Sequence, residues 1–221
     1  MILLIRQTAS NISQEFEIYA DDRYLYGGAL GRWHRYQAIR LWDNKGKPVM
    51  QGEYLMPWQD GQMGEKGWLS QGCRITRGEV DAGNFVYVQE SFKKSHYRIT
   101  LPGDKTIEVY ARDKGAFEYL SVYDGEQQIA LVEIYLTTED YKYTYKLYLL
   151  ETHDELGDIL ALFILYYANW NYAKRFHMSK GSMHVRSWSY SAYNDRYDPT
   201  WRERHFPREN FFGKVGLFDE E

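Results

Sequence analysis

The sequence has little cysteine and no long apolar run. Only one of its 221 residues is a cysteine, Cys73, which excludes an intramolecular disulfide and a cysteine-rich zinc site. A lone thiol favours a reducing compartment, and we expect Cys73 to be a small buried strand residue. The longest apolar run, 159–168, is far shorter than the ~20 residues of a membrane-spanning helix. The four apolar residues after Met1 are too few for a signal peptide. We therefore expect a cytoplasmic protein that does not span a membrane.

The sequence also lacks a surplus of basic residues. It holds 27 Lys and Arg against 31 Asp and Glu, for a formal net charge of −4. A general nucleic-acid-binding protein would carry a basic surplus, so we expect no nucleic-acid partner. Proline is scarce, with 5 residues, whereas 21 Tyr, 10 Phe and 7 Trp give a high aromatic content. Tyrosine is enriched in strands, so this composition favours β structure.

Residues 1 to about 150 read as about eleven or twelve short strands separated by turn signals. Residues 15–20 and 143–150 alternate apolar and polar positions, the period of a half-buried strand. Residues 43–46 and the pair Asp124-Gly125 are typical of hairpin turns. Strands at this spacing predict a sandwich or a barrel.

The pattern changes to helical at about residue 153 and continues to about 174. Asp154 or Thr152 is the expected N-cap. The middle of this helix is apolar on every side, so protein or lipid must surround it. It is too short for lipid, and a closed sheet of the preceding strands would enclose it. The fold class predicted is therefore all-β with one buried helix: a closed antiparallel barrel of about 12 strands around a central hydrophobic helix.

Residues 175–221 differ from the predicted barrel domain, 1–174, and form a C-terminal appendage. The appendage is rich in arginine and aromatic residues, with eight basic and seven acidic side chains. So many aromatics are unusual for a solvated tail, and we expect them to pack on the outside of the barrel or on a partner chain. Trp, Tyr and Arg are frequent at protein interfaces. The candidate partner-binding residues, which would also join a homo-oligomer, are Trp188, Tyr190, Trp201 and Arg202.

No catalytic constellation stands out in the sequence. The six histidines form no H-x-x-x-H pair and there is no G-x-S-x-G motif, so we assign no catalytic residue, metal or cofactor. Glu133 lies in an apolar strand and is either a buried carboxylate with a raised pKa or, as we expect, a residue that points outward to solvent. An enzyme stays open as an alternative, with a site between barrel rim and appendage where His177 or His184 would meet Asp195.

About eleven strands followed by one apolar helix resemble the tubby-like barrel superfamily, which includes the tubby domain, the phospholipid scramblases and the LURP-one-related proteins. The likeness is strongest over 128–168, with strands at 129–134 and 143–150 and then the helix from Asp154. It covers residues 1 to about 174 and is one of architecture, because the tubby headgroup residues have no matching motif here. The resemblance implies a closed barrel of about twelve strands and, as in tubby domains, binding of phosphoinositide headgroups.

Two basic clusters suit this expectation. Residues 31–35 read Gly-Arg-Trp-His-Arg, and residues 91–96 contain two adjacent lysines. Basic side chains would neutralise phosphates while an indole sits at the membrane interface. The candidate ligand-binding residues are Arg32, Trp33, Arg35, Lys93 and Lys94. We therefore expect a non-enzymatic binding or scaffold protein for anionic lipid headgroups or a protein partner; the alternatives are the enzyme above and an oligomeric structural protein joined by the appendage.

Overall fold

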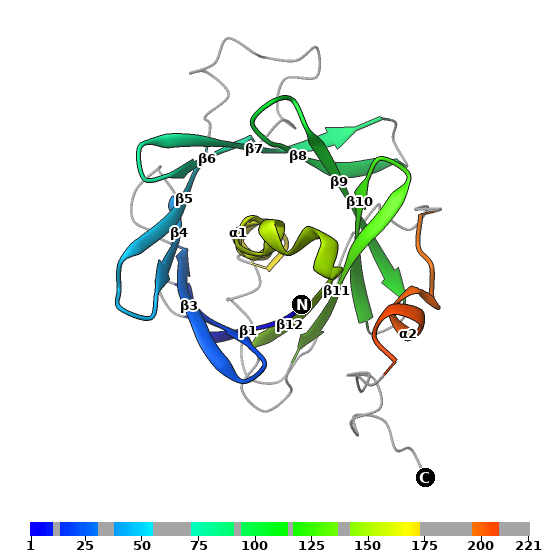
Figure 1. Cartoon of the computed structure of the whole chain (residues 1–221), viewed down its shortest axis with the longest axis horizontal. Helices are drawn as coiled ribbons and strands as arrows, with labels where there is room; N and C mark the ends of the chain where they lie inside the picture. The colour runs from blue at the N-terminus through cyan, green and yellow to red at the C-terminus, as the bar shows by residue number, and fades with distance from the viewer. Residues whose placement is uncertain are drawn as a thin grey trace, which may run out of the picture.

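The computed structural model describes residues 1–10, 14–30, 38–54, 72–90, 94–114, 117–136, 142–172 and 196–207. These residues form a closed antiparallel barrel of twelve strands with one long helix in its lumen (Figure 1). The expected fold class is confirmed. The Cys73 side chain is buried in a strand, also as expected.

Each strand pairs with its neighbours in chain order, and the first pairs with the last to close the barrel. The closing pair is in register from Ile2 opposite Tyr148 to Arg6 opposite Thr144. The strands are β1 (Ile2–Ser10), β2 (Gln14–Ala20), β3 (Arg23–Leu30), β4 (Ala38–Asp43), β5 (Pro48–Tyr54), β6 (Cys73–Arg77), β7 (Val80–Gln89), β8 (Ser95–Thr100), β9 (Thr106–Lys114), β10 (Phe117–Asp124), β11 (Gln127–Leu136) and β12 (Tyr143–Leu149).

One strand begins earlier than its sequence suggests. The sequence predicts a strand over 84–92, but β7 begins at Val80, ends at Gln89 and passes through Gly83, where the register with β6 shifts. Gly83 has a φ of 121°, and a Cβ atom there would lie 2.0 Å from the carbonyl oxygen of Thr100. Only glycine fits this close approach, so the residue marks a bulge rather than the end of the strand.

The helix begins slightly earlier than expected, with a short 3₁₀ turn. The turn η1 (Glu151–Leu156) leads into α1 (Gly157–Tyr172). The expected cap is wrong, because the N-cap is Leu150, which makes no side-chain capping hydrogen bond. Asp154 instead lies 3.5 Å from the amino group of Met1. The extended chain leaving β12 therefore enters the lumen directly through η1.

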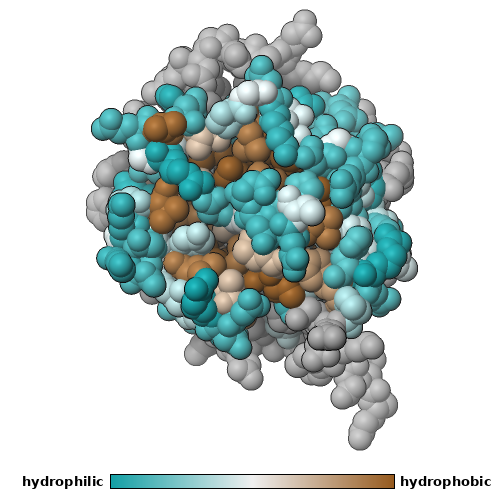
Figure 2. Space-filling view, viewed as in Figure 1, coloured by the Kyte–Doolittle hydropathy of each residue, from teal (hydrophilic) through white to brown (hydrophobic). Residues whose placement is uncertain are grey.

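Side chains of α1 fill the barrel. Every residue from Ile159 to Asn169 is buried. Phe163 packs edge to face against Phe85 and Tyr97, with ring centroids 5.3 and 5.6 Å apart. In the view down the barrel, apolar residues gather toward the middle of this end and hydrophilic residues surround them (Figure 2). The barrel encloses a helix that would otherwise expose apolar surface in every direction.

The two ends of the barrel differ in the connections they carry. The described turns 21–22, 44–47, 78–79, 101–105 and 125–126 all join strands at one end, because successive antiparallel strands alternate in direction. We call this end the turn rim. The connections that follow β1, β3, β5, β7, β9 and β11 all leave from the opposite end, which we call the far rim. All or most of the residues in those connections lie outside the described ranges.

Shortening the central aromatic of α1 tests this packing. We predict that Phe163→Ala lowers the free energy of unfolding by about 3–5 kcal/mol, because it removes a buried ring from a lumen that cannot collapse around the gap. Urea denaturation measures the change. Val80→Ala is the control, since Val80 is 70 % exposed and should change stability by less than about 0.5 kcal/mol. Equal losses for the two variants would contradict a tightly filled lumen.

Candidate functional site

The structure describes only some of the residues that the sequence singles out. Arg32, Trp33, Arg35 and Lys93 lie outside the described ranges, as do Trp188 and Tyr190. The described candidates are an exposed lysine and two buried residues of the appendage: Lys94, Trp201 and Arg202.

The strands that flank the two basic clusters nevertheless meet these connections at the same end of the barrel. Residues 31–37 lie between β3 and β4, and residues 90–94 lie between β7 and β8. Both connections leave from the far rim. Next to the second one, the backbone N–H of Glu90 donates to the carbonyl of Lys94 at 3.0 Å, which fixes where this hairpin leaves the sheet. Strand order thus attaches both candidate ligand-binding clusters to one rim.

The appendage returns to the outer face of the barrel through residues 196–207, which include α2 (Trp201–His205) (Figure 1). Trp201 is 3 % exposed and packs with Tyr119, Leu131 and Tyr148, one residue from each of β10, β11 and β12. Its indole N–H donates to the backbone carbonyl of Gln128 at 3.2 Å. The described residues of the appendage therefore pack on the outer face of β10–β12.

Arg202 lies beside Trp201 and covers a carboxylate. Its Nε is 3.5 Å from Oε1 of Glu133, and the Tyr148 hydroxyl donates to Oε2 of Glu133 at 3.1 Å. The expectation that Glu133 reaches solvent is wrong: the side chain does point outward, as alternation predicts, but it is 4 % exposed beneath α2. Burial raises the pKa of Glu133, and the Tyr148 hydrogen bond and Arg202 oppose that shift.

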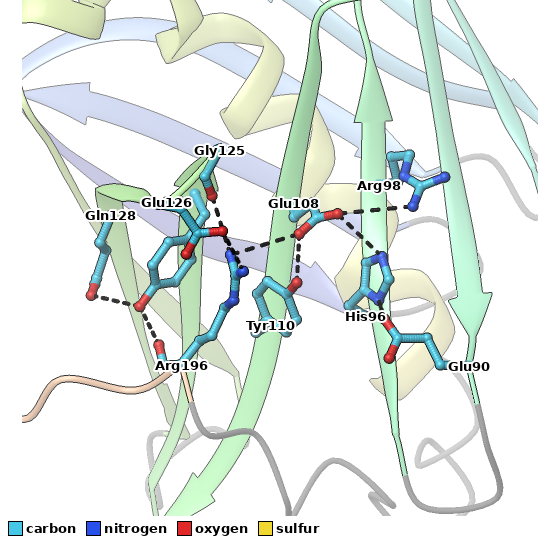
Figure 3. Close-up of polar contacts among 10 residues, drawn as sticks. Glu90, His96, Arg98, Glu108, Tyr110, Gly125, Glu126, Gln128 and Arg196 are labelled. Carbon is cyan, nitrogen blue, oxygen red and sulfur yellow. Dashed lines mark hydrogen bonds and ion pairs between the residues drawn. The ribbon is translucent and has the colours of Figure 1, made fainter.

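A second group of polar side chains lies on the outer face of β8 and β9 (Figure 3). His96 is 3 % exposed and stacks on the ring of Tyr110, 5.2 Å between centroids. Its Nδ1 lies 3.1 Å from a carboxylate oxygen of Glu90, and its Nε2 lies 3.8 Å from one of Glu108. Among the residues that the structure describes, neither ring nitrogen has a partner with hydrogen-bond geometry. Burial lowers the pKa of His96, and the carboxylates of Glu108 and Glu90 oppose the shift.

Arg196 connects this polar group to the appendage. Its guanidinium donates to the carbonyl of Gly125 at 3.1 Å and to the carboxylate of Glu126 at 3.0 Å (Figure 3). The same group lies over the rings of Tyr110 and Tyr123, at 5.3 and 5.2 Å from their centroids. The Tyr123 hydroxyl donates to the backbone carbonyl of Arg196. Arg196 therefore fixes the point at which the described part of the appendage meets the barrel.

The described residues do not combine into a catalytic arrangement. The two nitrogens of His96 face different carboxylates, and the Tyr110 hydroxyl donates to Glu108 rather than to the imidazole. A nucleophile needs a hydrogen-bonded base, and His96 has no such partner among these side chains. Nor do the described ranges hold three or more His, Cys, Asp or Glu side chains grouped to bind a metal. His177, His184 and Asp195, named for the enzyme alternative, lie outside those ranges.

Sequence reasoning missed the groups around His96 and Arg196. Alternation in β8 does place His96 and Arg98 on the face opposite Tyr97 and Ile99. Their outward direction could therefore have been predicted from the sequence. The sequence carries no signal for the register that brings Glu108 opposite Arg98, or for the return of Arg196 to this face.

Scans against models of protein families, against curated proteins and against solved structures found no match to this chain. The resemblance to tubby-like barrels therefore stays a prediction that rests on architecture. None of the described helices has the length and apolar content needed to cross a bilayer.

The burial of His96 predicts a pH dependence of stability. Because its pKa is lower in the folded chain than in the unfolded one, the unfolded chain takes up the proton first as pH falls below about 6.5. The free energy of unfolding should therefore decrease as pH is lowered from 7.5 to 5.5. The decrease should be smaller in the His96→Gln variant. Urea denaturation at several pH values measures it.

The matched control is His205→Gln, which makes the same substitution at an exposed histidine of α2 and leaves the buried imidazole of His96 in place. A wild-type chain that gains stability on acidification would show that Glu90 and Glu108 outweigh burial, and would contradict this account.

Proposed function

We propose that this chain is a non-enzymatic binding protein that uses the outside of its barrel, and that its far rim binds anionic lipid headgroups. The observation that carries the proposal is that both basic clusters, 31–35 and 93–94, belong to connections leaving from the same rim. Side chains spread over both ends could not face one membrane together.

The filled lumen directs binding to the outside. Tyr54 stacks on Tyr166 of α1 at 5.7 Å, and its hydroxyl accepts a hydrogen bond from Asn169 at 2.7 Å. A barrel that holds a small ligand needs its interior for that ligand, whereas this interior is occupied by α1. The proposal therefore places recognition on the rim and the outer wall.

The residue types of the two clusters suit a negatively charged membrane surface. Arg32, Arg35, Lys93 and Lys94 supply four positive charges, each worth about 1 kcal/mol near an anionic bilayer. Trp33 offers an indole, which is favoured at the level of the headgroups. The predicted resemblance to tubby domains, which bind phosphoinositide headgroups, agrees with this choice of ligand.

A protein partner is the second candidate for what this chain binds. Trp201 and Arg202, predicted to bind a partner, are buried against this chain's own barrel. A partner would therefore have to use Trp188 and Tyr190 or replace residues 196–207 on the wall. The scaffold role, the homo-oligomer and the cytoplasmic location stay predictions.

Vesicle sedimentation tests the lipid proposal. We predict that the full chain binds vesicles containing anionic lipid but not vesicles of neutral phosphatidylcholine, and binds more weakly at 150 mM than at 20 mM salt, because screening shortens the range of charge attraction. The double variants Arg32→Glu/Arg35→Glu and Lys93→Glu/Lys94→Glu should each lose at least tenfold in binding.

The matched control is Lys45→Glu/Lys47→Glu, which makes the same charge change on the turn rim. Both control lysines are exposed, and the turn is held by their backbone N–H groups donating to Asp43 at 2.8 and 2.9 Å. No binding at either salt concentration, or an equal loss in the control, would overturn the proposal.

A further inference from the structure

Residues 196–207 contact the barrel at two places, one through polar contacts of Arg196 and one through an aromatic group that Trp201 and Phe206 share with Tyr148. Arg196 binds the carbonyl of Gly125 and the carboxylate of Glu126. Trp201 inserts among the apolar residues of β10–β12 described above. Phe206 packs on Tyr148 with centroids 5.3 Å apart and on Trp201 at 5.8 Å. Side chains at both ends and in the middle of the segment therefore take part in these contacts.

The wall beneath this segment is unusual for an outer barrel face. Its apolar part consists of Tyr119, Leu131 and Tyr148, and beside it lies the carboxylate of Glu133. A buried carboxylate is costly unless a cation or hydrogen bonds compensate it, and here the guanidinium of Arg202 and the hydroxyl of Tyr148 are the compensating groups. An aromatic surface beside an acidic group is complementary to an aromatic residue followed by an arginine.

Many residues separate the wall-bound segment 196–207 from the end of α1 in the sequence. Residues 173–195 connect the end of α1 to Arg196. A segment carried on the same chain as its site binds it intramolecularly, and it competes there with any free ligand.

We propose that the outer face of β10–β12 is a peptide-binding site for a partner protein segment that carries Trp-Arg followed four residues after the Arg by Phe, and that residues 196–207 occupy this site as an internal competitor. The charge complementarity between Glu133 and an arginine, and the Trp201, Arg202 and Phe206 side chains already seated there, define the ligand. The site is distinct from the far rim and does not depend on lipid binding.

A labelled synthetic peptide of residues 196–207 tests the proposal by fluorescence anisotropy against the full chain. The wild-type chain should bind it weakly, because its own segment holds the site. The full-length variants Trp201→Ala and Phe206→Ala weaken the internal competitor and should each bind the peptide at least about tenfold more tightly. Adding Glu133→Gln to either variant should remove most of that gain.

The matched controls are a chain with Glu203→Gln, which changes an exposed residue of α2, and a peptide in which Trp201 and Arg202 are both alanine. The control chain should behave as the wild type and the control peptide should not bind. Circular dichroism of each variant confirms that the barrel is folded before binding is measured.

Failure of both Trp201→Ala and Phe206→Ala to bind the peptide, with the barrel folded, would overturn the proposal. Dimerisation of the wild-type chain that Trp201→Ala abolishes would overturn the choice of a foreign partner, because a second copy would then supply the segment. Tight peptide binding that survives Glu133→Gln would overturn the assigned role of the arginine.

Discussion

The burial of a helix that is apolar on all sides determines the rest of this structure. Such a helix must be covered in every direction, and ten residues of continuous apolar sequence, 159–168, are too few to be covered by a bilayer. A sheet closed on itself covers it with backbone hydrogen bonds satisfied and no free edge. The pairing of β1 with β12, the inward aromatic rings around Phe163 and the glycine bulge in β7 all serve that closure.

Filling the lumen moves the candidate functions to the outside. The two ends of the barrel and its outer wall differ in the connections and side chains that they carry. The turn rim is built of short turns, and the connections with both basic clusters follow strands that end at the far rim. The outer wall carries the buried Glu133 beneath Arg202 and the buried His96 on β8. Lipid headgroups at the far rim and a peptide at the wall are separate proposals, which rest on different residues.

Much of the fold could be predicted because its signals are local. Alternation in β2 and β12, the turn at 43–46 and the all-round apolar helix are each contained in a short window of sequence. The surface chemistry could not be predicted in the same way. Glu133 was correctly directed outward by alternation, yet its burial depends on Arg202, 69 positions further along the chain. The neighbours of His96 depend on the register between β8 and β9. The ion pairs of Glu108, one of those neighbours, also depend on Arg196, which lies far along the chain.

We infer that α1 belongs to the same cooperative unit as the barrel, whereas residues 196–207 are an added layer. Native-state amide hydrogen exchange measures the stability of both. We predict that the amides of 159–169 exchange only through global unfolding, with the same opening free energy as the slowest amides of β11 and β12. The amides of α2 should open at lower free energy, with the barrel intact. Exchange of α1 well before the strands would show that the helix leaves the barrel, and would contradict the account.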